Sequence, residues 1–242
     1  MKKILVSILL SGFFLGLTAQ EKEQEKDTIA VMILQRMSDV IGDLTSVSFK
    51  LTTSIDVDDY QYGVVKQFGW DEVYMVGPNK MLIHAYGYKG HRGFWYNGET
   101  TTYYSFDENN FAVIPSPKTI IATIDSIHNT YGIDFPAADF FYPTFTEDVL
   151  EYFDNVIFLG KKMVEGQECF HILATNEDMS AQFWVANDAF NLPKKFVLTY
   201  KNKGNKQYES NFSNWNLNPD VPNSAFNFLP PPQAVEIYLM PK

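Results

Sequence analysis

The sequence contains little that could cross-link the folded chain or attract an acidic partner. Its 242 residues include one cysteine, Cys169, so no disulfide can form within the chain. Basic residues are few, since 19 lysines and arginines stand against 29 acidic residues, for a formal net charge of −10. That sign is wrong for a phosphate-binding surface, so nucleic acid is not expected as a partner. Glycine and proline are too scarce for a collagen-like or low-complexity chain.

The first residues follow the pattern of an export signal. Lys2 and Lys3 precede an apolar run over residues 4–17, and Ala19 stands before a polar stretch. The run is too short to span a membrane, which takes about 20 residues, but it fits the core of a secretory signal peptide. We predict a signal peptide over 1–19, a flexible segment over 20–27 and one domain over 28–242. The mature protein is expected in the periplasm, without a transmembrane segment and without a lipid anchor, because no cysteine follows the cleavage site.

Apolar residues change their period along the chain, which separates helices from strands. Between residues 29 and 44 they recur at steps of three and four, which predicts an amphipathic helix. From residue 47 to 57 they alternate with polar residues, which predicts a long strand with one buried face. Further β-rich runs bring the total to about eleven strands. Asn97-Gly98, between two such runs, predicts a hairpin with a type I′ turn, which needs positive φ at both positions.

Two shorter helices are predicted in the middle of the chain. Ser116 as the N-cap and Pro117 at the first helical position begin a helix with an isoleucine face, for which Gly132 is the C-terminal stop. A connection rich in proline and phenylalanine leads to a second helix, capped by Thr146 and continuing to about Phe153.

The whole pattern indicates a mainly β fold with α-helices. We predict a single curved antiparallel sheet of about eleven strands, an unclosed half-barrel, with the helices covering its concave face because their apolar stripes must be buried. A two-sheet sandwich with peripheral helices remains the alternative.

Residues for catalysis or metal binding form no recognisable motif. The four histidines have no zinc-type spacing, and two of them, His84 and His171, lie in strands where a hydrogen-bonded structural role is expected. The chain has no serine nucleophile elbow and no phosphate-binding glycine loop. Cys169 stands in an apolar strand and is expected to be buried and unreactive. We therefore predict no enzyme activity, cofactor or metal, although a pair of catalytic carboxylates stays open among so many acids.

Apolar surface is the chemistry that remains. A curved sheet under a helical lid can enclose a cavity lined by large hydrophobic side chains, and the chain holds 20 Phe, 14 Tyr and 4 Trp. The predicted ligand-binding residues come from one face of the first strand and from the isoleucine face of the lid helix. They are Val47, Phe49, Leu51, Ile55, Ile120, Ile124 and Ile127. The same side chains could instead fill the core.

Several longer stretches follow a known pattern in order. They include Phe94-Trp95-Tyr96-Asn97-Gly98, Tyr131-Gly132-Ile133-Asp134-Phe135-Pro136 and Phe226-Asn227-Phe228-Leu229-Pro230-Pro231. In these the chain resembles the predicted periplasmic proteins called domain of unknown function 2092. More distantly it is similar to lipoprotein carriers and receptors of the LolA and LolB type, in which an unclosed antiparallel barrel under helices shelters acyl chains. The resemblance implies a fold, and no functional residue of those carriers matches a motif here. A receptor of that type would also need a lipid anchor.

Two functions follow as predictions. The first is a soluble periplasmic carrier that holds a hydrophobic ligand, such as a lipid or a lipoprotein acyl chain, in a lidded half-barrel. Its delivery partner would be an envelope lipoprotein or a membrane-associated protein. The alternative is a non-enzymatic interaction or structural module with a filled core, whose acidic surface or exposed aromatics contact another protein. Interior volume distinguishes the two.

Overall fold

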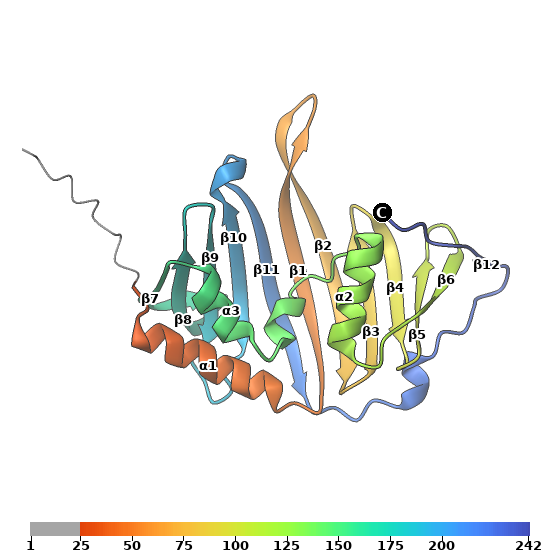
Figure 1. Ribbon diagram of the computed structural model, residues 1–242, viewed down its shortest axis with the longest axis horizontal. Helices are drawn as coiled ribbons and strands as arrows, with labels where there is room; N and C mark the ends of the chain where they lie inside the picture. The colour runs from red at the N-terminus through yellow and green to blue at the C-terminus, as the bar shows by residue number, and fades with distance from the viewer. Residues whose placement is uncertain (1–24) are drawn as a thin grey trace, which may run out of the picture.

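A computed structural model describes residues 25–242, which form one large sheet with three α-helices on the same face (Figure 1). The predicted signal peptide lies outside the described residues, as do residues 20–24 of the predicted flexible segment. Residues 25–27 are hydrogen-bonded to the β-strand that begins at Asn155. Asp27 N donates to Val156 O at 2.8 Å, and Val156 N donates to Glu25 O at 2.7 Å.

Twelve strands and three α-helices make up residues 25–242. The strands are β1 (Ser46–Asp59), β2 (Gly63–Val76), β3 (Lys80–Gly87), β4 (Gly90–Tyr96), β5 (Thr100–Ser105), β6 (Asn110–Pro115), β7 (Asn155–Val164), β8 (Gln167–Thr175), β9 (Met179–Ala186), β10 (Pro193–Tyr200), β11 (Lys206–Leu217) and β12 (Val235–Glu236). The helices are α1 (Thr28–Gly42), α2 (Ile120–Tyr131) and α3 (Phe145–Tyr152), with short 3-10 turns η1 (Ala138–Phe141), η2 (Lys201–Lys203) and η3 (Asn223–Phe226).

The sheet is continuous and unclosed. Its strand order is β12-β6-β5-β4-β3-β2-β1-β11-β10-β9-β8-β7, so two antiparallel meanders meet where β1 pairs with β11. Among these twelve described strands, only the short edge strand β12 pairs in parallel, with β6. The predicted curved antiparallel sheet is therefore confirmed, and the sandwich alternative is wrong. The described residues form twelve strands where about eleven were predicted, and residues 63–76 make a single long one, β2.

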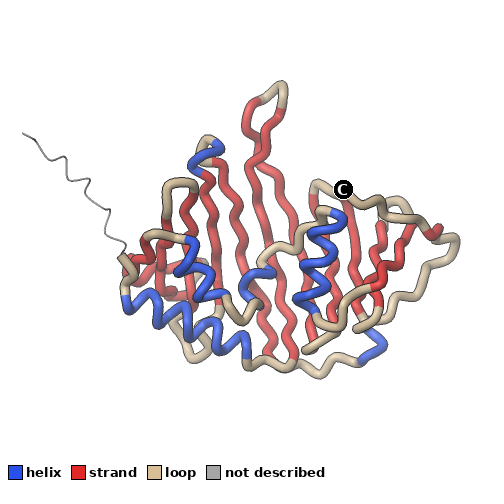
Figure 2. The backbone as a smooth tube through the Cα atoms, in the orientation of Figure 1, coloured by secondary structure: helices blue, strands red, loops and turns tan. Residues whose placement is uncertain are grey.

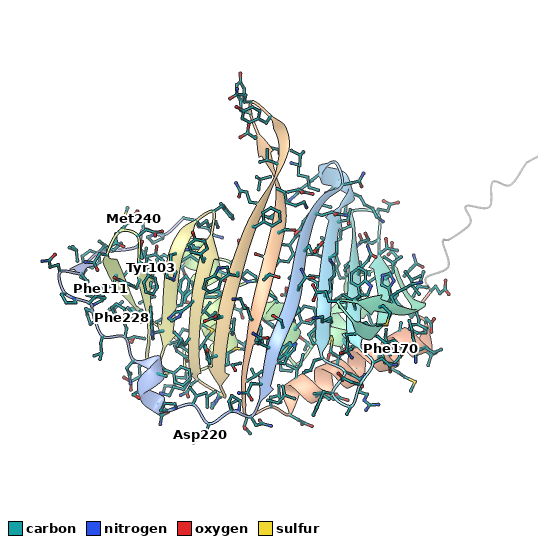
Figure 3. The ribbon with its side chains drawn as sticks, turned by 180° about the vertical axis from the view of Figure 1, so that it is seen from behind. Tyr103, Phe111, Phe170, Asp220, Phe228 and Met240 are labelled. Atoms are coloured by element: carbon teal, nitrogen blue, oxygen red, sulfur yellow. The ribbon has the colours of Figure 1, made fainter. Side chains whose placement is uncertain are left out.

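All three helices cover one face, as the blue segments of Figure 2 show. From the opposite side the strands stand in front of the helices (Figure 3). The core lies between these layers: Leu34 and Met37 of α1 are fully buried, and Phe140 of η1 packs 5.3 Å from Phe212 of β11 between ring centroids. Burial of such side chains stabilises the fold by about 1.5–3 kcal/mol each.

The helix starts differ from the sequence prediction. α2 begins after Thr119, whose hydroxyl accepts from Ala122 N at 3.3 Å. Ser116 is not the cap, because its side chain instead bonds Thr101 of the neighbouring strand at 2.9 Å. α3 begins after Thr144, while the predicted cap Thr146 is buried and bonds Ser38 of α1 at 2.8 Å. In both helices a tertiary partner takes up the hydroxyl that the local pattern assigned to a cap.

The β4–β5 hairpin is confirmed, but its turn is not type I′. Gly98 has a φ of +97°, whereas Asn97 is not among the residues with positive φ. Asn97 instead accepts hydrogen bonds through Oδ1 from the backbone N–H groups of Glu99 and Thr100, at 3.1 and 3.0 Å. This is an Asx-type turn, in which the side chain replaces a backbone acceptor. The predicted stop at Gly132 is confirmed by its φ of +66° at the end of α2.

Candidate ligand-binding cavity

A row of small residues crosses the sheet beneath α2. Thr53 of β1 pairs with Gly69 of β2, and Gly69 pairs with Gly87 of β3. A Cβ atom on Gly69 would lie 3.0 Å from the Tyr86 carbonyl oxygen, and one on Gly87 would lie 3.2 Å from the Cα of Gly69. The backbones therefore approach too closely for larger residues, and the paired glycines leave the sheet surface bare at this point.

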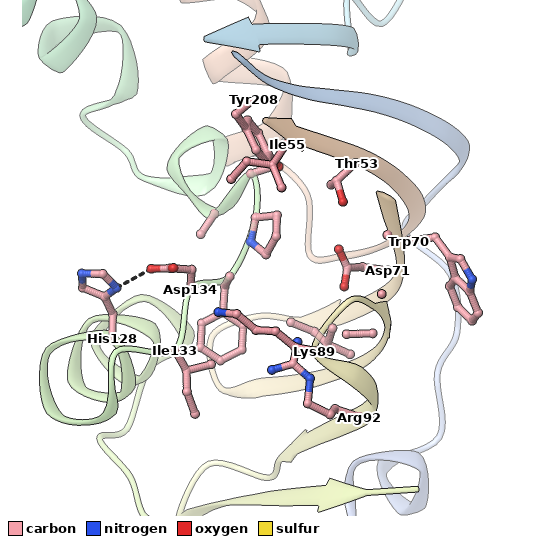
Figure 4. Close-up of a pocket in the computed structure, with 18 of the residues that line it drawn as sticks. Thr53, Ile55, Trp70, Asp71, Lys89, Arg92, His128, Ile133, Asp134 and Tyr208 are labelled. Atoms are coloured by element: carbon pink, nitrogen blue, oxygen red, sulfur yellow. Dashed lines mark ion pairs between the residues drawn. The ribbon is translucent and has the colours of Figure 1, made fainter. Parts of the chain in front are cut away.

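A cavity of about 520 Å³ lies over this row of glycines (Figure 4). Its volume falls within the range of about 300–1,000 Å³ that is usual for small-molecule sites. The apolar part of its wall comes from the sheet, from α2 and from the segment that follows α2. These side chains are Ile55, Ile83, Phe94, Ile124, Ile133, Phe135, Phe196 and Leu198. Phe94 and Phe135 meet edge to face with centroids 5.2 Å apart, which joins the sheet to residues 132–144, the covering segment between α2 and α3.

Two of the seven predicted ligand-binding residues line this cavity. They are Ile55 of β1 and Ile124 of α2, which the fold brings to opposite walls. The other five are buried and do not line it. They are Val47, Phe49 and Leu51 of β1 with Ile120 and Ile127 of α2.

The inward face of the first half of β1 borders no cavity, because aromatic rings from other elements pack against it. Phe49 stacks on Phe141 at 5.6 Å and packs on Trp215 at 4.6 Å, and Leu51 has no exposed surface. For this half of the strand the core-filling alternative describes the side chains.

The residues predicted to bind the ligand were all apolar, but the cavity wall also contains polar residues. Asp71 of β2 and Arg92 of β4 line it, as do Gln67 of β2 and Tyr208 of β11. Only 8% of Asp71 is exposed, and burial raises the pKa of its carboxyl to about 6 although the positive charge of Arg92 acts in the opposite direction. The alternation along β2 could have indicated that Asp71 faces inward, because it lies two residues from Val73 and four from Met75, on the same buried face of the strand. Trp70, the preceding residue, lies on the opposite face of the strand, and its side chain points away from the cavity (Figure 4).

The covering segment is tied to α2 by two contacts at the edge of the cavity. His128 Nδ1 lies 2.9 Å from Asp134 Oδ1, the ion pair drawn in Figure 4. Tyr142 OH donates to Asp125 Oδ1 at 2.5 Å, and burial together with this carboxylate raises the pKa of the Tyr142 hydroxyl. Both side chains of the ion pair are more than half exposed. An ion pair that is this exposed to water contributes little to the stability of the fold, about 0–1 kcal/mol.

A second hollow, of about 960 Å³, lies beside the end of α1. It is more open, and its wall mixes asparagines such as Asn214 and Asn216 with apolar residues such as Phe190 and Trp215. The sheet and α2 do not enclose it. The smaller cavity is therefore the better candidate for holding an apolar ligand.

The residues considered for chemistry have structural surroundings. Cys169 is fully buried, and burial raises the pKa of its thiol to about 11, which suppresses the thiolate. His171 bonds Gln182 at 3.0 Å and stacks on Trp184, as predicted for a structural histidine. His84 differs, because its Nε2 is buried without a hydrogen-bond partner in the described residues and its ring lies against Trp95 and Phe106. Within residues 25–242 no three His, Cys, Asp or Glu side chains are grouped to hold a metal ion.

Comparison with solved structures gives distant likenesses. An uncharacterised conserved protein of Thermus thermophilus is 10% identical, with a TM-score of 0.49 over 86% of this chain and 98% of that chain. The lipoprotein LppX of Mycobacterium tuberculosis is 14% identical, with a TM-score of 0.46 over 81% and 99%. LprF of Mycobacterium bovis is 12% identical, with a TM-score of 0.48 over 82% and 97%. No functional conclusion follows from likenesses at this level.

Sequence comparison places the chain in a family. No curated protein matches it significantly. No helix within residues 25–242 combines the length and apolar character needed to cross a membrane. The model of the family described as predicted periplasmic protein, DUF2092, matches residues 30–240, which is most of the chain. The chain therefore belongs to the DUF2092 family of predicted periplasmic proteins.

Proposed function

We propose that this protein is a periplasmic carrier that binds a hydrophobic ligand, a lipid or an acyl chain, in the cavity between the sheet and α2. The observation that supports the proposal most directly is a cavity of about 520 Å³ over a glycine floor, whose wall includes large apolar side chains from the sheet, α2 and the segment after α2. Ile55 and Ile124 contact the ligand from opposite sides. The signal peptide over residues 1–19 directs export, and the mature chain carries no lipid anchor.

Burial of the acyl chain is the main favourable contribution to the binding of such a ligand. Each methylene moved from water to an apolar surface contributes about 0.8 kcal/mol, so about fourteen of them contribute on the order of 11 kcal/mol. Immobilising the ligand costs an estimated 4–15 kcal/mol, so at the low end of that cost about 7 kcal/mol remains, which corresponds to a moderate affinity. A carrier must release its cargo, and moderate affinity suits that task.

Release requires the covering segment to separate from α2. The two polar contacts at the cavity edge are weak enough to break reversibly, because the His128–Asp134 pair is exposed to water. The segment is also held by apolar contacts, of Phe135 with Phe94 and of Phe140 and Phe141 with aromatic residues of the sheet. Opening of the whole segment therefore exposes several large aromatic side chains.

One observation favours the alternative, an interaction module. The β1–β2 hairpin extends beyond the rest of the sheet (Figure 1) and ends in two exposed aromatic residues, Tyr60 and Tyr62. An exposed aromatic pair suits a protein interface. Under this alternative the cavity stays without a ligand.

Native mass spectrometry with organic extraction distinguishes the two. The full chain is expressed with export, purified from the periplasm without detergent, and measured before and after addition of lipids. A co-purifying lipid near one-to-one stoichiometry is the expected result. A mass of the chain alone, unchanged by added lipid, would contradict the carrier and favour the interaction module.

A variant localises the binding to the cavity. Ile124→Asp places a charge in the wall and is expected to abolish lipid retention, whereas Ile29→Asp at a residue 53% exposed on α1 is the matched control. If Ile124→Asp fails to fold, Ile55→Trp fills the cavity from the sheet side. Retention of lipid by a folded Ile124→Asp or Ile55→Trp variant would contradict the assignment of the site.

A further inference from the structure

Four polar residues surround the glycine floor of the cavity. Asp71 lies two residues along β2 from Gly69 in one direction, and Gln67 lies two residues along in the other, so all three share the inward face. Arg92 of β4 pairs with Ala85 of β3, which in turn pairs with Asp71, so Arg92 and Asp71 face the same side of the sheet. Tyr208 of β11 pairs with Ile55, which in turn pairs with Gln67. We call Gln67, Asp71, Arg92 and Tyr208 the polar ring.

Within the described chain, the polar ring lacks hydrogen bonds that would satisfy it. Gln67 Oε1, Arg92 Nε and Tyr208 OH are buried atoms without a hydrogen bond of good geometry within residues 25–242. Burial raises the pKa of the Tyr208 hydroxyl, although the Ser210 hydroxyl is close enough to act on this pKa in the opposite direction. Among the same residues neither Asp71 nor Arg92 takes part in an ion pair. Buried polar groups without partners are costly and rare in folded proteins. Three such atoms and a buried carboxyl around one cavity point to a ligand that completes their hydrogen bonds.

The spacing leaves room for a polar group between the two charges. Asp71 and Arg92 are separated by Ala85 of β3, so their Cα atoms stand two strand spacings apart, on the order of 10 Å. Ala85 carries only a methyl group and also lines the cavity. Both side chains line the cavity, and in Figure 4 the Asp71 carboxylate and the Arg92 guanidinium lie apart.

The donors and acceptors define the class of that group. Arg92 only donates, Gln67 Oε1 and an ionised Asp71 only accept, and the Tyr208 hydroxyl does both. A ligand group that completes them must itself both donate and accept. Hydroxyls and amides meet this requirement, while an ester alone accepts without donating.

The charge of the wall argues against an anionic group. Asp71, Asp125, Asp134 and Asp139 line the cavity, and the basic residues Lys89 and Arg92 only partly balance them. A carboxylate or phosphate on the ligand would meet Arg92 but also these acids. An uncharged group avoids that repulsion.

We propose that the polar ring binds the uncharged, hydroxyl-bearing end of a single-chain lipid, such as a monoacylglycerol, while the acyl chain lies along the apolar wall. This inference rests on the proposed carrier function. The hydroxyl accepts from Arg92 and donates to Asp71, and the ring thereby fixes which end of the lipid enters between β2 and β4.

Competition against a neutral fluorescent probe, Nile red, tests the inference at pH 8. The full chain, exported and purified from the periplasm and then delipidated, is titrated with 1-monooleoylglycerol, with methyl oleate, which lacks the hydroxyls, and with oleate. We expect monooleoylglycerol to bind at least about 10-fold more tightly than methyl oleate and than oleate, a preference that hydrogen bonds to charged groups supply.

Variants assign the preference to the polar ring. Arg92→Met keeps the length of the side chain without its donors and is expected to lower the preference to less than about 3-fold, whereas Arg36→Met at the exposed arginine of α1 keeps it. If Arg92→Met does not fold, Tyr208→Phe, which removes one hydroxyl of the polar ring, replaces it in the same comparison and is expected to lower the preference. Equal binding of monooleoylglycerol and methyl oleate, or a preference unchanged in both variants, overturns the inference and leaves the carrier standing. Failure of Nile red and every lipid to bind overturns both.

Discussion

Replacing Asp71 by asparagine should stabilise the protein at neutral pH. Asp71 is 8% exposed, and burial raises the pKa of its carboxyl from 3.8 to about 6, despite the opposing charge of Arg92. A pKa raised in the folded state means that the native protein holds this proton more tightly than the unfolded chain between about pH 4 and pH 6. The wild-type free energy of unfolding therefore loses a contribution as the pH rises through this window, and the loss is complete above about pH 7.

The size of the loss follows from the shift. Each pKa unit corresponds to 1.36 kcal/mol, so a change from 3.8 to about 6 makes the ionised Asp71 cost about 3 kcal/mol. The amide introduced by Asp71→Asn has nearly the same shape as the carboxyl that it replaces, and it does not titrate. The variant should thus be up to about 3 kcal/mol more stable than wild type at pH 8, and this advantage should disappear near pH 4.

Urea unfolding followed by tryptophan fluorescence at intervals between pH 4 and pH 8 measures the difference. Asp220→Asn, at an exposed carboxyl that follows β11 and is labelled in Figure 3, is the matched control and should track wild type. The reasoning is refuted if the wild-type and Asp71→Asn curves stay parallel, or if wild type gains stability relative to the variant as the pH rises from 4 to 6.

Three further outcomes follow from the packing. Gly69→Ala places a Cβ 3.0 Å from the Tyr86 carbonyl oxygen, so it should lower the free energy of unfolding in urea by about 1–3 kcal/mol and weaken Nile red binding; an unchanged midpoint would contradict the close approach. Leu51→Ala should cost about 2–5 kcal/mol in the same assay, and Ile55→Ala clearly less, because Leu51 is packed and Ile55 borders the cavity; equal losses would contradict this contrast. Cys169 should react with iodoacetamide at least about 100-fold more slowly in the native protein than in urea, and comparable rates would show that its thiol is accessible.

Periodicity was sufficient to predict the sheet because each strand buries one face. The alternation from Val47 to Val57 predicted β1, and the short turns predicted antiparallel neighbours. Turn and cap details were harder, since they depend on which partner a polar side chain finds. Ser116 is a good N-cap residue by type, yet Thr101 lies 2.9 Å from its hydroxyl, and only the tertiary structure brings the two together.

The cavity could be predicted only in part, for a different reason. Alternation marks every inward residue of β1 in the same way, but whether a side chain borders space or fills the core depends on what covers it. Phe49 is covered by Phe141 and Trp215, which are far away in sequence. Gly69 and Gly87 are visible in the sequence, but their pairing across two strands requires the register.

The sheet, more than the helical lid, determines where the cavity lies. Along the inward face of β1 and its neighbours, side-chain size falls from the aromatic layer of Phe49 and Phe212 to the row of Gly69 and Gly87. α2 presents Ile120 and Ile124 to the core on the same helical face, yet only Ile124 stands above the glycines and borders the cavity. The same kind of side chain is thus packed or cavity-lining according to the strand residues opposite it. The polar ring surrounds those same glycines, so its side chains border the space that the missing side chains leave open.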